Sequence, residues 1–246
     1  MKRFMLTIAY DGTAYSGFQI QKNHPTIEGE LQRCLCELLK EEIHVIGGSR
    51  TDAGVHALCN VAVFDSETNI PPEKLSYAIN QRLPQDIRIM SSREVPYDFH
   101  PRHCDTKKTY EYRITRGEFP IPTKRLYTYF TYHNLDLEKM QEAADFLTGE
   151  HDFKSFCAAA AVVESTVRTI YSITVREEKE DIVIQVCGNG FLYNMVRIIA
   201  GTLMEAGKGK WEPERILDIL NARDRKKAGP TAPACGLTLI KYEFVG

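Results

Sequence analysis

The chain has 246 residues, of which 43% are hydrophobic, 26% charged and 10% aromatic. That composition indicates a globular protein with one large domain or two small ones, and it excludes collagen-like, low-complexity and disordered classes. The 31 basic and 33 acidic side chains leave a net charge of -2, so no global positive field attracts a nucleic acid.

Cysteine usage and the start of the chain indicate the compartment. The seven cysteines are an odd number and include no C-x-x-C pair, so we expect buried thiols in a reducing compartment. The first residues, MKRFMLTIAYDG, lack the apolar core of a signal peptide, and no apolar stretch is long enough to span a bilayer. We therefore expect a cytoplasmic protein that does not contact a membrane.

Apolar periodicity in the first 105 residues predicts the order strand, helix, strand, strand, helix, strand. Alternating apolar side chains indicate the strands, and apolar side chains at helical spacing indicate the helices. Thr26 and Pro72 are typical of helix starts. The predicted elements are a strand over 4–10, a helix over 27–39, strands over 43–46 and 61–64, a helix over 72–83 and a strand over 87–94.

From residue 106 onward the same order recurs with additional helices. The predicted elements are a strand over 109–115, a helix over 137–147 capped by Asp136, strands over 170–176 and 182–187, helices over 191–206 and from Pro213, and a strand over 237–244. We therefore expect an α+β fold with two ferredoxin-like (split βαβ) halves, 1–105 and 106–246. The halves are expected to form one large antiparallel sheet, with helices on one face and a binding cleft on the other.

The motif GGSRTDAGVHA, residues 47–57, is the strongest candidate for chemistry. It holds a carboxylate, Asp52, among small residues near Arg50, so a substrate can approach closely and the acid is favoured in its ionised form. An Asx turn or a helix cap explains the same residues. Arg197 lies in an otherwise apolar helix and needs a partner there, because an unpaired buried charge costs several kcal/mol. Asp52 is a candidate for that partner.

Three competing motifs are incomplete. The sequence around Ser49 misses the last glycine of the nucleophile elbow G-x-S-x-G, which argues against a serine hydrolase. GNGFLY, residues 188–193, lacks the third glycine of a dinucleotide fingerprint and follows two successive strands. His100, His103 and Cys104 have no second pair of ligands at a matching spacing, so we expect no metal site.

Basic and aromatic residues are concentrated in two segments. Residues 102–125 hold seven Lys and Arg against three acids, and residues 208–227 hold seven against four. Within the first segment, Tyr110 and Tyr112 share one face of a strand, where a ring can stack on a nucleobase beside lysines that hold phosphates. Solvated charge and ordinary sheet packing explain the same pattern.

Taken together, these motifs resemble the tRNA pseudouridine synthase A (TruA) family along nearly the whole chain. The two most specific matches are RTDAGVH and GNGFLYNMVR. The matching segments are YDGTAYSGFQ (10–19), SRTDAGVHA (49–57), the LP-DI step (83–87), FHPR (99–102), KKTYEY (107–112), GEHDFKSF (149–156), GNGFLYNMVR (188–197) and APACGL (232–237).

The resemblance implies a function and roles for particular residues. It implies that Asp52 is the catalytic aspartate, Arg197 its basic partner, Tyr110 the tyrosine that contacts the target uracil, and Arg50 a residue for RNA binding and base flipping. The implied reaction converts uridine to pseudouridine in the anticodon stem-loop of tRNA, at nucleotides 38 to 40, without cofactor or metal. The implied assembly is a homodimer with an RNA-binding cleft.

Two details stay open at this point. A carboxylate can attack either C1′ of the ribose or C6 of the base, and sequence does not choose between these routes. Phosphate contacts are expected from basic residues of the cleft, for which we favour Lys107, Lys108 and Arg102.

The chain departs from the usual pattern of that family near the expected site. Phe18 replaces a common Trp, Ser49 a usual Gly, and Cys59-Asn60 a usual Gly-Gln. One alternative is therefore a related enzyme that modifies another RNA position. A second alternative is a non-catalytic RNA-folding factor that depends on the two basic segments, and a third is a hydrolase that uses Ser49.

Overall fold

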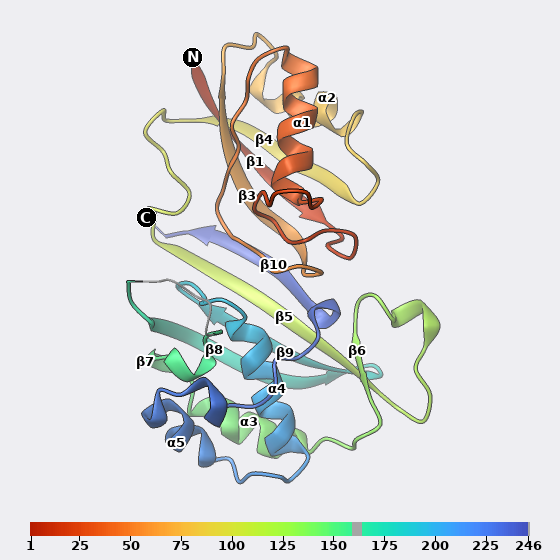
Figure 1. Ribbon diagram of the computed structural model, residues 1–246, viewed down its shortest axis with the longest axis vertical. Helices are drawn as coiled ribbons and strands as arrows, with labels where there is room; N and C mark the ends of the chain where they lie inside the picture. Colours follow the sequence, from red (N-terminus) through yellow and green to blue (C-terminus); the bar gives the residue numbers. More distant parts are fainter. Residues whose placement is uncertain (159–163, 246) are drawn as a thin grey trace. The chain divides into compact units, whose positions relative to one another are not determined.

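The computed structural model describes residues 1–158 and 164–245, and these form two compact units (Figure 1). Unit 1 comprises Met1–Asp105 and Leu239–Gly246, and unit 2 comprises Thr106–Thr238. Each unit combines a sheet with helices, so the α+β class is confirmed.

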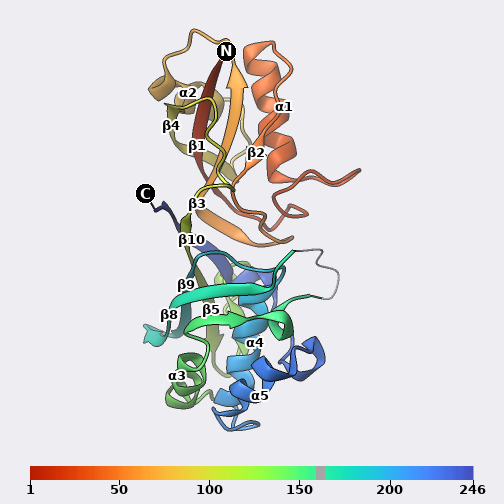
Figure 2. The ribbon, with the colours of Figure 1, turned by 90° about the vertical axis from the view of Figure 1, so that its left-hand side faces the viewer.

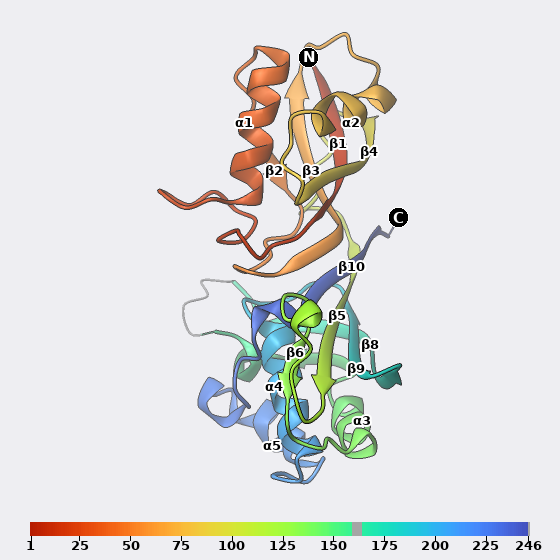
Figure 3. The same ribbon diagram turned by 90° about the vertical axis from the view of Figure 1, so that its right-hand side faces the viewer.

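Unit 1 has the ferredoxin-like order β1-α1-β2-β3-α2-β4, joined by the last strand of the chain. Its strands lie in the order β4-β1-β3-β10, with β2 also paired to β3. The pairs of β1 with β3 and β4 are antiparallel. The two helices contact each other, and α2 packs on β4 (Figure 3). The elements are β1 Lys2–Tyr10, α1 Ile27–Leu39, β2 Ile46–Gly47, β3 His56–Ser66, α2 Pro72–Asn80, β4 Ile87–Val95 and β10 Leu237–Phe244.

Local signals explain where α1 begins and ends. The Thr26 side chain accepts a hydrogen bond from the amide of Gly29, as expected of an N-cap. The helix ends at Leu39, because the C-cap residue Lys40 adopts a left-handed conformation with φ 59°. Its buried face includes Ile27 and Leu31, which pack on the unit-1 core with no exposed surface. The predicted helix over 27–39 is therefore confirmed at both ends.

Unit 2 has strands in the order β5-β9-β8-β7, with β6 paired to β5 in parallel. The helices α3 and α4 contact each other, α3 packs on β8 and α4 on β5 (Figure 2). The described pairs are otherwise antiparallel, as predicted. The elements are β5 Thr106–Arg116, β6 Tyr129–Thr131, α3 Leu137–Asp145, β7 Gly149–Asp152, β8 Val167–Glu178, β9 Asp181–Gly188, α4 Met195–Gly207 and α5 Arg215–Ala222.

Helix α4 is the central helix of unit 2. Every residue in it except Arg197 is buried. Gly201 allows the backbone at Pro230 to cross the helix, because a methyl group at position 201 would clash with the Pro230 carbonyl oxygen. The hydroxyl of Thr202 accepts a hydrogen bond of 2.9 Å from the amide of Gly229. The segment before the APACGL motif is thereby fixed against α4.

Several predicted elements differ in extent from the structure. Helix α4 begins at Met195 rather than at residue 191, because Asn194 adopts a left-handed conformation with φ 60°. The strand over 43–46 is reduced to Ile46–Gly47, and α2 ends at Asn80. The short strands β6 and β7 were not predicted.

The structure shows the state of the cysteines and the character of the helices. All seven cysteines are free thiols, but only Cys34 and Cys157 are buried and the other five are half-buried, so the prediction of buried thiols is only partly correct. Across the described residues, no helix has both the length and the apolar character needed to cross a membrane.

Candidate active site

Asp52 lies in a loop, residues 48–55, that links β2 to β3. The amide of Val55 donates to the carbonyl oxygen of Asp52 at 3.2 Å, and Gly54 has φ 75°. A positive φ at the third position is typical of a type II turn, which only glycine adopts readily. Strand β3 follows at His56, so the helix-cap alternative is wrong. The Asp52 side chain is half-buried and Arg50 is exposed.

The segment YDGTAYSGFQ, residues 10–19, is hydrogen-bonded to this loop. The amide of Phe18 donates to the carbonyl of Thr51 at 3.1 Å, and the amide of Gly54 donates to the carbonyl of Tyr15 at 3.2 Å. The hydroxyls of Tyr10 and Thr51 form a buried hydrogen bond of 2.7 Å. Residues on both sides of Asp52 are thus fixed by the same segment, which restricts the directions that its carboxylate can take.

Asn60 extends this support and is fully buried. Its side-chain amide donates to the carbonyl of Ser49 at 2.9 Å and to the Tyr10 hydroxyl at 3.0 Å. Its side-chain oxygen accepts from the amide of Val61 at 2.9 Å. Two positions that depart from the resembled family, Ser49 and Asn60, therefore contact each other directly.

We expect Asn60→Leu to lower both stability and turnover. The substitution keeps the branching of the side-chain heavy atoms but removes all three hydrogen bonds and leaves the buried Ser49 carbonyl without that donor, at a cost of about 2 kcal/mol. Loss of loop support should also lower kcat more than it raises KM. The measurements are urea unfolding and steady-state kinetics on tRNA.

Asn80→Leu is the matched control, because Asn80 also bonds a backbone carbonyl and amide, both of Ile89, at 2.8 and 2.7 Å. It should lose stability while kcat is retained. An Asn60→Leu enzyme whose kcat equals that of Asn80→Leu would show that Asn60 does not position the loop.

Tyr110 lies on β5 opposite Val186 of β9. Its ring is 6% exposed and stands perpendicular to the ring of Phe191, with centroids 5.2 Å apart. Tyr112, on the same face of the strand, is fully buried and donates to the carbonyl of Pro233 at 2.9 Å. Burial raises the pKa of Tyr112, which therefore remains a neutral hydrogen-bond donor. Sheet packing is thus the correct interpretation for Tyr112.

Arg197 is the third residue of α4, and its guanidinium is anchored within unit 2. Nε donates to the carbonyl of Ala232 at 2.8 Å, and Nη1 donates to the side-chain oxygen of Asn194 at 2.9 Å. The left-handed conformation of Asn194 places that oxygen at the start of the helix. The charge thus occupies a fixed position in an otherwise buried helix.

The basic residues of segment 102–125 differ in their ion pairing. Three are bound to carboxylates within unit 2. These are Arg113 with Glu111 at 2.6 Å, Arg116 with Glu177 at 2.7 Å and Lys124 with Asp181 at 2.8 Å. Arg102 and Lys107 are exposed and form no ion pair with any described residue, and the Lys107 ammonium lies 5.2 Å from the centre of the Tyr171 ring. Lys108, which follows Lys107 on β5, is half-buried. Arg102 belongs to unit 1 and the two lysines to unit 2.

Most of segment 208–227 is neutralised by neighbouring acids. Lys208 and Lys210 both bind the carboxylate of Glu205, at 2.9 and 2.6 Å. Arg215 binds Asp218 and Arg223 binds Asp152, at 2.9 and 3.0 Å. The solvated-face interpretation therefore fits this segment better than an interface with RNA.

The competing motifs lack the geometry that they require. Ser49 is 7% exposed, whereas the serine of a nucleophile elbow stands open to solvent. GNGFLY follows the antiparallel pair β8 and β9, not a parallel βαβ unit. The rings of His100 and His103 stack 3.9 Å apart. Within residues 1–158 and 164–245, no three His, Cys, Asp or Glu side chains form a group that could hold a metal ion.

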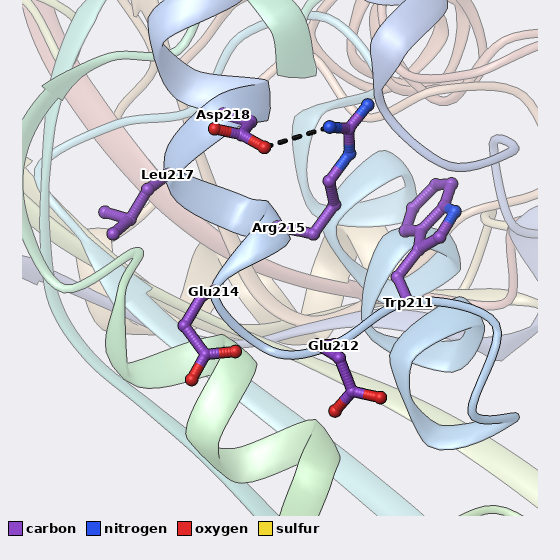
Figure 4. Close-up of a pocket in the computed structure, with 6 residues that line it drawn as sticks. All are labelled: Trp211, Glu212, Glu214, Arg215, Leu217 and Asp218. Carbon is purple, nitrogen blue, oxygen red and sulfur yellow. Dashed lines mark hydrogen bonds and ion pairs between the residues drawn. The ribbon is translucent and has the colours of Figure 1, made fainter.

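A cavity of about 520 Å³ lies at the start of α5 (Figure 4). It is lined by Trp211, Leu217 and a pair formed by Arg215 and Asp218, together with two glutamates. Three carboxylates against one guanidinium disfavour a polyanion, and none of the predicted site residues lines the cavity. We assign it no part in substrate binding.

Comparison with known proteins identifies the family. A family model described as tRNA pseudouridine synthase matches residues 6–103 and 143–245. The chain is 46% identical over 244 residues to tRNA pseudouridine synthase A of Thermoanaerobacter sp. (strain X514), covering 99% of this chain and 100% of that protein. It is 45% identical, with the same coverage, to tRNA pseudouridine synthase A of Acetivibrio thermocellus and to tRNA pseudouridine synthase A 2 of Clostridium perfringens.

These matches extend over both units and include the Asp52 loop and the start of α4. These matches place the protein among the RNA-modifying isomerases. The chain belongs to the tRNA pseudouridine synthase family.

Proposed function

We propose that Asp52 is the nucleophile with which this protein converts uridine to pseudouridine. Family membership makes the protein a pseudouridine synthase, an isomerase that acts on tRNA. The observation that supports Asp52 is its loop: the half-buried carboxylate stands on a backbone whose neighbouring residues are held by the bonds of Thr51 with Phe18 and of Gly54 with Tyr15, and by the bond of Asn60 to Ser49. A nucleophile must be held in one direction to gain from proximity, and this loop provides such support.

The reaction begins with extrusion of the target, because a stacked uridine is out of reach of a side chain. Extrusion costs a few kcal/mol. The Asp52 carboxylate then attacks either C1′ of the ribose or C6 of the base, and the bond between N1 and C1′ breaks. The uracil turns and C5 bonds to C1′, the bond between Asp52 and the substrate breaks and restores the carboxylate, the C5 proton leaves and N1 gains a proton. The product is an isomer of the substrate, so the reaction consumes no redox partner.

We assign the remaining roles from the resemblance and from the local geometry of each residue. Tyr110 stacks on the extruded uracil, and exposed Arg50 assists extrusion. Arg197, whose guanidinium is oriented by Ala232 and Asn194, supplies the cation that keeps Asp52 ionised. A double-mutant cycle of Asp52→Asn and Arg197→Gln tests this pairing, since coupled residues show strongly non-additive losses.

We further propose that the target lies at nucleotides 38 to 40 of the anticodon stem-loop, and that a cytoplasmic homodimer acts there. The direct experiment incubates the purified protein with tRNA carrying 5-tritiated uridine and then maps pseudouridine along the product. Tritium release with pseudouridine at these nucleotides supports the proposal. Pseudouridine only at other nucleotides refutes the position, and a monomeric mass in sedimentation refutes the dimer.

Lys107 should contribute a phosphate contact, because it is exposed and forms no ion pair among the residues that the structure describes. We expect Lys107→Gln to weaken tRNA binding and to reduce the slope of log affinity against log salt by about 1. Filter binding across a salt series measures both quantities. Lys226→Gln, which removes an exposed lysine from the largely neutralised segment 208–227, is the control. Equal effects of the two substitutions would contradict the assignment.

A further inference from the structure

Arg168, on β8, is a half-buried guanidinium that pairs with no acidic side chain of the described residues. Its Nη1 donates to the carbonyls of Ser165 and Val167, at 3.0 and 2.6 Å. No carboxylate among the described residues pairs with it, and residues 159–163 are alanines and valines by sequence. Burial lowers the pKa of Arg168, as expected where no nearby anion compensates for lost hydration.

The other arginines of the unit-2 sheet form ion pairs with carboxylates. Arg113, Arg116 and Arg176 each have a carboxylate oxygen within 3.2 Å. Removing a cation from water without an anion is unfavourable, and proteins generally avoid it. The isolation of Arg168 therefore indicates that its counter-charge comes from outside the chain.

The free edge of this guanidinium has the geometry for a phosphate. Both bonds of Arg168 to described residues start from Nη1, so Nε and Nη2 remain available. These two N–H groups are parallel and form the fork with which arginine binds a carboxylate or phosphate in bidentate fashion.

Arg168 also lies next to residues that contact Tyr110. A methyl group on Gly190 would lie 3.8 Å from the Arg168 Nε, so the side chain extends along the backbone of that residue. The next residue, Phe191, contacts the ring of Tyr110. Gly188, at the end of β9, pairs with Lys108 in the sheet. The guanidinium thus belongs to the same surface as the tyrosine and lysine assigned to the substrate.

We propose that Arg168 binds a backbone phosphate of the tRNA beside the target uridine through its Nε and Nη2. This inference rests on the proposed function, because the surface of Tyr110 must face the RNA. A phosphodiester supplies the missing negative charge and leaves the bonds to Ser165 and Val167 intact.

The test measures tRNA affinity of Arg168→Gln across a salt series, together with urea unfolding of the free protein. A lost charge-assisted bidentate contact should weaken binding by ~10- to 100-fold and reduce the salt slope by about 1. Stability of the free protein should not fall, because the substitution removes an uncompensated charge. Arg168→Lys should retain the salt slope and recover only part of the affinity, because a lysine cannot form the fork.

Arg116→Gln is the matched control, because Arg116 is paired with Glu177 and should not alter the salt slope. Wild-type affinity and slope in Arg168→Gln would overturn the inference. So would a loss of binding that merely parallels a loss of stability in both Arg168 variants. Failure of the wild-type protein to release tritium would instead refute the proposed function, so the two failures are distinguishable.

Discussion

Asp52→Asn is expected to reduce pseudouridine formation by at least ~10⁴-fold while the protein still folds and binds tRNA. The amide has the shape of the carboxylate but cannot form a bond to the substrate carbon, so the covalent route is closed. The hydrogen bonds that hold the loop involve the backbone and the neighbours of Asp52, including Thr51 and Gly54, and they remain available to the variant. Tritium release and filter binding measure the two properties separately.

Asp65→Asn is the control for this prediction. Asp65 is a half-buried carboxylate of unit 1 that accepts two hydrogen bonds of 2.7 Å from Arg3. Its replacement should lower stability and leave turnover unchanged. Activity that survives in Asp52→Asn would exclude this residue as the nucleophile. It would also favour an RNA-folding factor if the variant fully replaces the wild-type protein in cells.

Gly17→Ala is the second substitution with a large expected effect. Gly17 has φ 94°, and a Cβ atom there would lie 2.7 Å from the carbonyl oxygen of Thr51, next to Asp52. Left-handed strain and overpacking together should cost about 2 to 4 kcal/mol. The clash should also displace the loop and lower kcat. Urea unfolding and tritium release measure the two effects.

Gly209→Ala separates the two causes, because Gly209 has φ 70° but nothing within 4 Å of its Cβ position. It carries only the backbone strain, so we expect a loss of about 1 kcal/mol and normal turnover. If both glycine variants lost the same stability and retained full activity, the contact with Thr51 would not support the catalytic loop.

Elements with strong local signals could be predicted from sequence. Helix α1 has an N-cap at Thr26 and a regular apolar stripe, and β10 has clear alternation, so both were predicted with the observed bounds. The predicted start of α4 at residue 191 is wrong, because the left-handed conformation of Asn194 interrupts a continuous apolar pattern. Strands β6 and β7 have three and four residues and are defined by their partners, which local sequence does not reveal.

In the candidate site, too, sequence shows the residues with a local motif but not those whose role depends on distant partners. The Asp52 motif stands out in the sequence because small residues surround a charged one. The role of Asn60 depends on the pairing of β1 with β3, in which Ile8 lies opposite Asn60 and the register shifts before Tyr10. Arg168 belongs to no chemical motif, and local sequence does not show that it lacks the ion pairs that Arg113, Arg116 and Arg176 of the same sheet form with described residues.

The central claim is that the Asp52 carboxylate forms a bond to the target nucleotide. The most direct measurement replaces the target uridine of the tRNA by 5-fluorouridine, whose C5 carries no proton to lose, and identifies any protein–RNA adduct by peptide mass spectrometry. The account predicts an adduct on the peptide that contains Asp52 and none with the Asp52→Asn protein. An adduct on another residue, or one of equal yield with Asp52→Asn, would contradict it.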